Sequence, residues 1–480
     1  MSGAKSGAKA PGGASPHELV VVGGGISGLA VAHFARLEGG IDDVVVLEAA
    51  PRPGGKVQTE WIDGYCCEWG PQGFLDNVQD TLDLAGQLGL NDRLVRASDA
   101  SSDRFIARGG RLRRVPLSPP AFLISDVLSL PGRLRVLLEP FQSRGPVEES
   151  VFDFAARRIG VEAASVLVDA MVTGVYAGDP RRLSLPATFP RMREMESLHG
   201  SLVRAMVAKA RERRRAPAEG RDVTRAAGPA GPGGTLTTFR MGMQEITDAL
   251  AASLAGRVRT AAEVEGIERT SSGFGIRLAG GDRVEARSVA LAVPPAPAAT
   301  MLRGLLPAPA IAALRSIPTV RVAVVMTGYR TPRPFREPTR GFGFLVPAVE
   351  GRRVLGTIFC DATFPDQAPP GHTLLRTLLG GARDGAVVDL SDADLVAAAR
   401  RDLSDYLGGD PRPDFVRVIR HPYAIPQYTL GHLERLAAID AALAGLPGLT
   451  LTGNGFRGIA LNACVTEARA LASRFARTPR

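Results

Sequence analysis

The amino-acid sequence predicts a mixed α/β protein. Apolar strands at residues 20–22 and 449–452 are each followed by glycines and a helical pattern, an order typical of parallel sheets covered by helices. Residues 116–141 instead show the spacing of a pair of helices. With 480 residues, of which 45% are hydrophobic, the chain is long enough for two or three domains with a sizeable core.

The first strand, Val20–Val22, runs into a glycine turn that opens a helix. Gly23, Gly25 and Gly28 fit the pattern G-x-G-x-x-G. The first glycine permits a tight turn, the second lets a pyrophosphate approach the backbone, and the third lets helix and strand pack closely. Amides at the helix N-terminus, where Ile26 and Ser27 stand, then face the phosphate charge. The pattern predicts a Rossmann-like nucleotide-binding unit.

A second apolar strand, residues 44–47, ends in an acidic residue. Glu48 follows Gly28 by about 20 residues, the spacing at which a carboxylate holds the ribose hydroxyls of a bound dinucleotide. The complete order of strand, glycine turn, helix, strand and acidic residue therefore predicts a binding site for an adenine dinucleotide. The glycines alone would also suit a structural turn.

The residues after Glu48 favour FAD over NAD. The run from Glu48 to Thr59 resembles the E-x-x-x-R-x-G-G-[RK]-x-x-T extension of the flavoproteins that include amine oxidases, phytoene desaturases and protoporphyrinogen oxidases. Gly55, preceded by another glycine, lets backbone reach the phosphates again, and Arg52 and Lys56 can neutralise their charge.

Composition excludes several other classes. The formal charge of +9 and pI near 9.8 suit a membrane surface, a carboxylated substrate or nucleic acid. No zinc-finger spacing or aromatic stacking pattern supports nucleic acid, and no histidine or cysteine spacing indicates a metal. Four cysteines without C-x-x-C suggest reduced thiols. Residues 1–16 are expected to be a disordered tail, and no apolar run is long enough to span a membrane.

The remaining elements are expected in the following order. A hairpin at 61–65 precedes a glycine-containing loop at 68–74 that includes Gly70 and Pro71. Next come a helix at 81–90, a strand at 104–107 and an arginine-rich loop at 209–234. A helix at 244–254, short strands near 258, 263–267 and 274–278, and a buried strand at 289–294 follow. The chain ends with a strand at 449–453 and a helix at 464–475.

Residues 116–141 have two interpretations. Their apolar side chains are bracketed by arginines and could enter an anionic lipid surface. The same pattern suits an ordinary pair of core helices, which periodicity alone favours.

Longer segments resemble one family, the oxygen-dependent protoporphyrinogen oxidases of haem synthesis, over almost all of residues 18–476. The resemblance rests on Glu68–Phe74, Gly174–Pro180, Leu183-Ser184, Gly341–Pro347, Ala424–His432 and Gly453–Asn462. The run Ile-Pro-Gln-Tyr-Thr-Leu-Gly-His within 424–432 is far more specific than any glycine motif.

The resemblance implies a discontinuous architecture. It implies a Rossmann-like FAD-binding domain from residues 17–97, 236–297 and 441–480, and a substrate domain with a mixed sheet from 206–235 and 298–440. A helical membrane-binding domain is expected at 98–205, which favours the lipid interpretation of residues 116–141.

The resemblance also implies site residues. Arg104 falls where the family binds a propionate, Leu345, Ile358 and Leu378 where it sandwiches the macrocycle, and Gly174 where backbone approaches the substrate. Further cofactor contacts are implied at Gly70, Pro71, Val264, Gly453, Asn454, Ile459, Ala460 and Leu461. No catalytic acid or base is assigned, because no histidine lies in a motif that the family uses for one.

The implied reaction is oxidation of protoporphyrinogen IX by oxygen, with hydrogen peroxide as by-product, on the cytoplasmic face of the inner membrane. Oxidation of coproporphyrinogen III, which carries more propionates, is the nearest alternative. An amine oxidase, a carotenoid desaturase, or a flavin-bound scaffold without activity are others. The resemblance leaves open a docking partner such as ferrochelatase and a homodimer.

Overall fold

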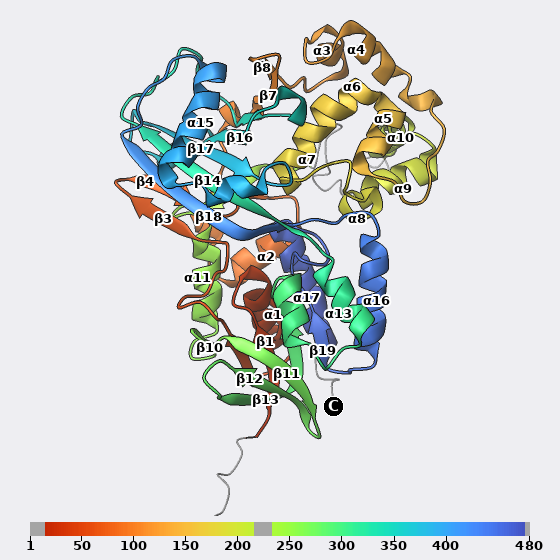
Figure 1. Cartoon of the computed structure of the whole chain (residues 1–480), viewed down its shortest axis with the longest axis vertical. Coiled ribbons are helices and arrows are strands. Elements are labelled where there is room, and N and C mark those ends of the chain that lie inside the picture. Colours follow the sequence, from red (N-terminus) through yellow and green to blue (C-terminus); the bar gives the residue numbers. More distant parts are fainter. Residues whose placement is uncertain (1–14, 216–232, 476–480) are drawn as a thin grey trace, which may run out of the picture.

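Two seven-stranded sheets and a group of helices build the protein, of which the computed structural model describes residues 15–215 and 233–475. The first sheet and its helices lie at the lower end in Figure 1, the second sheet lies above it, and most helices of residues 119–215 gather beside the second sheet.

The first sheet joins strands from three distant parts of the chain. Its order is β10 (Val258–Arg259), β2 (Val44–Leu47), β1 (His17–Val22), β13 (Arg283–Leu291), β12 (Gly273–Leu278) and β11 (Val264–Thr270), and β19 (Leu449–Leu451) also pairs with β13. The strands β10, β2, β1, β13 and β19 are parallel. Residues 289–291 of the predicted buried strand are therefore the end of the longer β13, and residues 292–294 lie beyond it.

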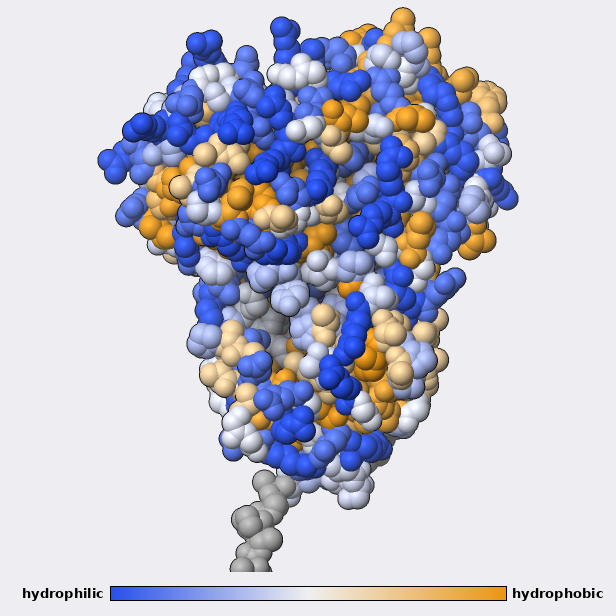
Figure 2. All heavy atoms as spheres, viewed as in Figure 1, coloured by the Kyte–Doolittle hydropathy of each residue, from blue (hydrophilic) through white to orange (hydrophobic). Residues whose placement is uncertain are grey.

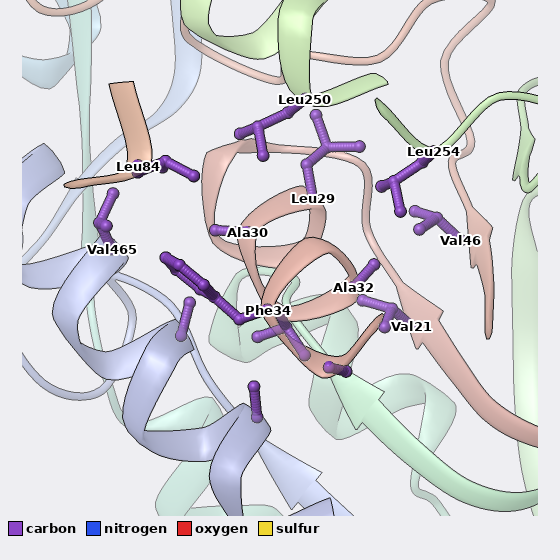
Figure 3. Packing of buried hydrophobic residues seen from close by; sticks show 14 of the residues in the cluster. Val21, Leu29, Ala30, Ala32, Phe34, Val46, Leu84, Leu250, Leu254 and Val465 are labelled. Carbon is purple, nitrogen blue, oxygen red and sulfur yellow. The ribbon is translucent and has the colours of Figure 1, made fainter. Parts of the chain in front are cut away.

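Helix α1 (Ile26–Leu37) lies in the core of this layer. Figure 3 shows its Leu29 and Phe34 between sheet residues such as Val21 and the helices around it. Those helices are α2 (Gln79–Gln87), α11 (Gln244–Ser253) and α17 (Leu461–Phe475). Ser27 to Ala35 are all buried, as expected for a helix enclosed on most sides.

The second sheet has the order β18 (Phe415–Pro426), β14 (Thr319–Tyr329), β17 (Thr373–Gly380), β16 (Val354–Phe359), β15 (Gly343–Leu345), β7 (Arg104–Arg108) and β8 (Arg111–Arg114). Helix α15 (Asp392–Leu407) covers one face. Strands β7 and β8 extend this sheet because β7 pairs in parallel with β15, although residues 104–114 lie in the range predicted to form the helical unit.

The helical part contains α3 (Pro119–Ile124), α4 (Leu130–Leu137), α5 (Val151–Ile159), α7 (Asp169–Tyr176), α9 (Pro190–His199) and α10 (Leu202–Arg215). The guanidinium of Arg158 is fully buried and lies 2.5 Å from Glu196 Oε1 and 3.3 Å from Glu139 Oε1. A buried charge needs such partners, so this cluster ties α5 to α9 and to the turn after α4.

Several smaller predictions can be compared with these elements. The hairpin near 61–65 is formed by β3 (Thr59–Ile62) and β4 (Tyr65–Glu68). Short strands β5 (Phe74–Leu75), β6 (Leu94–Arg96) and β9 (Leu236–Phe239) form a separate three-stranded sheet. The prediction of a loop beginning at residue 209 was wrong: residues 209–215 continue helix α10, since arginine and lysine favour helix. The rest of that predicted loop, 216–232, and most of the predicted tail lie outside the described residues.

Candidate functional site

The predicted glycine turn joins β1 to α1 with little space to spare. Gly23 has a φ of +104°, and a β-carbon on it would lie 2.6 Å from Ala292 O. A β-carbon on Gly28 would lie 1.9 Å from Gly23 O. No side chain caps the N-terminus of α1. The turn therefore presents backbone N–H groups that can donate hydrogen bonds to an anion.

Glu48 lies at the end of β2, where the sequence places it, and contacts the turn directly. Its Oε2 accepts the Gly24 N–H at 2.6 Å, and its Oε1 accepts the Ala50 N–H at 2.8 Å. The N–H of Ala262 bonds the Glu48 carbonyl at 2.8 Å, which brings buried Val264 close to the same strand end. The Glu48 carboxylate, which was predicted to bind a ribose, thus also holds the backbone of the glycine turn.

The second glycine segment meets the first. The Gly54 N–H donates to Gly24 O at 2.8 Å, and a β-carbon on Gly55 would lie 3.1 Å from Gly25 Cα. The Arg52 Nη2 beside them is buried and has no hydrogen-bond partner. A buried cationic nitrogen without an acceptor is costly, and a phosphate oxygen would satisfy it.

Lys56 links the glycine segment to the second sheet. Its Nζ donates to the carbonyl of Ala424 in β18 at 2.7 Å. Burial lowers the pKa of this amine to about 8. A β-carbon on Gly70 would lie 2.2 Å from Lys56 O, so the two backbones touch. The predicted loop that contains Gly70 and Pro71 therefore lies against the glycine segment.

The C-terminal unit approaches the same turn. After β19, Gly453 has a φ of +100°, and a β-carbon on it would lie 3.4 Å from Ser27 Oγ. The hydroxyl of Tyr428 donates to Asn454 O at 2.7 Å. Ile459 is half-buried, Ala460 is exposed, and Leu461 is the first residue of α17, earlier than the predicted helix start at 464.

These observations together fit FAD. Three glycine segments, 23–28, 54–55 and 453, lie against one another, and an uncapped helix and a half-buried arginine with an unpartnered Nη2 lie beside them. When bound, FAD would rest its phosphates on Gly23, Gly25 and Arg52, with Lys56 and Gly70 nearer the second sheet. The cysteines in the described part are buried thiols, and no group of side chains in these ranges could hold a metal ion.

The predicted substrate residues share one face of the second sheet. Arg104 is in register with Gly343, Gly343 with Ile358, and Ile358 with Arg376. Two residues along the strands, and so on the same face, Leu345 is opposite Gly356, which is opposite Leu378. Residues in register point to the same side of a sheet. Leu345, Ile358 and Leu378 are half-buried, which leaves apolar surface available on this face.

Helix α7 brings Gly174 to this face. A β-carbon on Gly174 would lie 3.0 Å from Leu345 Cδ1, so helix and strand are in contact there. Arg104 is exposed at the start of β7, with its guanidinium 5.6 Å from the centre of the Phe342 ring. The structure thus brings Arg104, Gly174, Leu345, Ile358 and Leu378 together.

Two residues of the site were missed at the level of sequence. Arg376 is 5% exposed and donates from Nη2 to Gly70 O at 2.6 Å. Glu68 is wholly buried and accepts hydrogen bonds from Met243 N–H and Thr59 Oγ1. Burial raises the pKa of Glu68 to about 7. A lone arginine within the apolar run 374–379 was the available signal, because an unpaired charge rarely enters a buried strand.

Comparison with known proteins extends these findings. The family model described as flavin containing amine oxidoreductase matches residues 26–474. The chain is 36% identical to a chloroplastic protoporphyrinogen oxidase of Oryza sativa subsp. japonica over 98% of this chain and 90% of that protein. It is 30% identical to a coproporphyrinogen III oxidase of Bacillus subtilis over 95% of this chain and 97% of that protein.

A solved structure agrees in fold. The crystal structure of a protein from Exiguobacterium sp. 255-15 superposes with a TM-score of 0.81 at 25% identity. The superposition covers 97% of this chain and 99% of that protein. The two proteins therefore share this fold over almost their whole length.

Proposed function

The chain belongs to the flavin containing amine oxidoreductase family, and within it we propose that it oxidises protoporphyrinogen IX to protoporphyrin IX with oxygen. The chain is an FAD-dependent oxidoreductase. One observation carries the choice of substrate: an exposed cation, Arg104, and three half-buried apolar side chains share one face of the second sheet.

This face suits a porphyrinogen, which is an apolar disc with propionates at one edge. Leu345, Ile358 and Leu378 would contact the ring, and Arg104 would pair with a propionate. Gly174 leaves room for the disc because it adds no side chain to α7. The chain's task is to bind and orient the ring and to keep water from it.

The overall reaction removes six hydrogens from the macrocycle and reduces three molecules of oxygen to three of hydrogen peroxide. Bound FAD supplies the two-electron chemistry, both the acceptance of a hydride and the reaction with oxygen. We assign no acid or base: His421 bonds Trp69 O and His432 bonds Phe456 O, and burial lowers both pKa values, that of His432 to about 4. Tautomerisation of pyrrole N–H groups would carry the protons.

Coproporphyrinogen III remains the alternative substrate, because the chain also matches a coproporphyrinogen III oxidase. Its additional propionates require additional cations. In the row Arg104, Gly343, Ile358 and Arg376, the second arginine is committed to backbone carbonyls, so Arg104 is the cation in this row that remains exposed. This favours the substrate with fewer propionates.

A membrane surface is the partner we propose for α3 and α4. In the described ranges no helix is long and apolar enough to cross a bilayer. Apolar side chains are nevertheless exposed on these helices and the turn after them, and Figure 2 shows apolar residues at the end of the molecule where Figure 1 places α3 and α4. They include Leu123, Ile124, Leu130, Leu134, Leu137, Leu138 and Phe141.

The arginines in and near these helices contribute less than their number suggests. Arg133 donates to Leu123 O and Arg135 to the carbonyls of Arg157 and Arg158, while Arg113 pairs with Asp126. Contact with lipid would therefore rest mainly on apolar burial. We propose a peripheral protein on the cytoplasmic face of the inner membrane. A ferrochelatase partner and a homodimer remain hypotheses without an observation of their own.

The stoichiometry tests the proposed reaction. Purified protein with FAD is supplied with protoporphyrinogen IX in air, and porphyrin, oxygen and peroxide are followed together, with heat-denatured protein as control for spontaneous oxidation. We expect three peroxides for each porphyrin. Formation of porphyrin no faster than in the control would overturn the proposal.

A further inference from the structure

We propose that Arg376 is a positioning residue that fixes the Glu68–Gly70 loop, and through it the flavin, against the substrate-binding face. The proposal rests on the proposed function and adds a residue to it. Arg376 lies on β17, in register with Ile358 and two residues before Leu378, on the face that carries the candidate substrate residues.

The guanidinium binds three successive carbonyls of one loop. Arg376 Nε donates to Glu68 O at 3.3 Å, and Nη2 donates to Gly70 O at 2.6 Å and contacts Trp69 O at 3.5 Å. The side chain is 5% exposed, so these carbonyls would lack water if it were removed. The planar fork of arginine reaches several acceptors at once, which the single ammonium of lysine does not.

The loop is anchored at its other side to the cofactor segments. The Glu68 carboxylate accepts a hydrogen bond from the N–H of Met243, at the start of α11, at 2.7 Å, and another from Thr59 Oγ1 at 2.9 Å. Gly70 touches the backbone of Lys56. The Nε2 of His421, also from the second sheet, donates to Trp69 O at 2.8 Å. The loop thus connects the glycine segment to the substrate sheet, beside the hydrogen bond from Lys56 to Ala424.

This arrangement lets Arg376 determine the distance between the Gly70 backbone and strand β17. Its backbone is part of the same strand as Leu378, and its side chain sets how far the Gly70 backbone lies from that strand. A loop displaced by about 1 Å would change the separation of flavin and substrate carbon, which can cost about 100-fold in rate. Binding of either ligand alone depends less on that separation.

Trp69 provides a readout within the loop itself. The chain has two tryptophans, Trp61 and Trp69, so a Trp61→Phe background isolates the emission of Trp69. Arg376→Lys and Arg376→Gln are compared in this background for acrylamide quenching, FAD affinity, flavin absorption, kcat and KM. The matched controls are Arg420→Lys and Arg420→Gln. Arg420 also binds two carbonyls, Val388 O and Leu390 O, but from the opposite face of the sheet.

We expect both Arg376 variants to lower kcat by about tenfold or more with KM changed less than about twofold. Trp69 should become more accessible to acrylamide and the flavin absorption bands should shift, while the Arg420 variants leave all of these unchanged. The proposal would be overturned if the folded Arg376 variants kept the wild-type kcat, acrylamide quenching and flavin spectrum. It would also be overturned if the variants lost thermal stability while these three properties stayed unchanged. Should Arg376→Gln fail to fold, Arg376→Lys, which keeps the charge, still decides it. Quenching and flavin spectra need no porphyrinogen, so they judge Arg376 even if the wild-type protein oxidises none.

Discussion

Gly174 of α7 packs directly on Leu345 of β15: a β-carbon at position 174 would lie 3.0 Å from Leu345 Cδ1 and 3.1 Å from Cδ2. The same leucine lies 2.9 Å from a β-carbon built on Gly356. Two glycines therefore hold one side chain that is a candidate wall of the substrate site, and its position depends on their lack of side chains.

Replacing Gly174 by alanine should change substrate binding without loss of stability. Alanine favours helix by about 1 kcal/mol over glycine, but the new methyl must displace Leu345. We expect KM for porphyrinogen to rise by roughly tenfold, the scale of one methylene in a hydrophobic pocket. Steady-state kinetics and thermal unfolding measure both. Gly86→Ala in α2, where a β-carbon meets nothing closer than 3.4 Å, is the control and should not alter KM.

Arg104→Ala should weaken porphyrinogen binding more than FAD binding. Loss of a charge-assisted hydrogen bond to a propionate predicts a rise in KM of roughly tenfold, and the FAD dissociation constant, measured by fluorescence titration, should stay as in the wild type. Arg111→Ala, an exposed arginine of the adjacent strand β8, serves as control. Equal losses of both ligands would indicate a role of Arg104 in folding.

FAD affinity should depend on pH through Lys56. Its pKa in the folded apoprotein is about 8, below the ordinary value of 10.5. The unfolded chain therefore holds this proton between these values, and the stability of the apoprotein decreases as pH falls from about 10.5 to about 8. A nearby phosphate raises the pKa again, so FAD binding takes up a proton and weakens as pH rises above about 8.

Titrations of FAD into apoprotein from pH 7 to pH 10 check this dependence. Lys56→Met should remove it, and Lys209→Met, at an exposed position of α10, should preserve it. The same pH dependence in the Lys56→Met protein would show that another group is responsible.

Vesicle binding should depend on exposed apolar residues of α3 and the turn after α4. Ile124 is 85% exposed and Phe141 79% exposed. Each should bury apolar surface in lipid, so Ile124→Glu combined with Phe141→Glu should reduce partitioning by at least about tenfold. Co-sedimentation with anionic vesicles measures it. Leu37→Glu, 59% exposed at the end of α1, is the control. Abolition of binding by salt alone would instead favour an electrostatic contact.

Local patterns predicted the nucleotide-binding unit well, because the turn at Gly23, the following helix and Glu48 are adjacent in sequence and follow fixed spacing. The substrate-face residues were available only through family resemblance. Arg104 and Leu378 are far apart in the chain, and strand register alone aligns them on one face. Single-sequence patterns do not encode such pairing between distant strands.

Side-chain partners were the least predictable part. Nothing in the sequence indicates that Arg376 binds the carbonyls of Glu68 and Gly70, because those contacts arise when the two sheets are brought together. The helix over residues 209–215 was missed for a different reason: a run of arginines suits either a loop or an exposed helix, and the helical propensity of arginine and lysine lets α10 continue through it.

The central claim is tested most directly by comparing two substrates on one preparation of the FAD-loaded protein. Protoporphyrinogen IX and coproporphyrinogen III are supplied separately in air, and porphyrin fluorescence and peroxide give kcat/KM for each. We predict oxidation of both at different rates, with the larger kcat/KM for protoporphyrinogen and peroxide formed in proportion. A larger kcat/KM for coproporphyrinogen, or no oxidation of either substrate with FAD bound, would contradict the account.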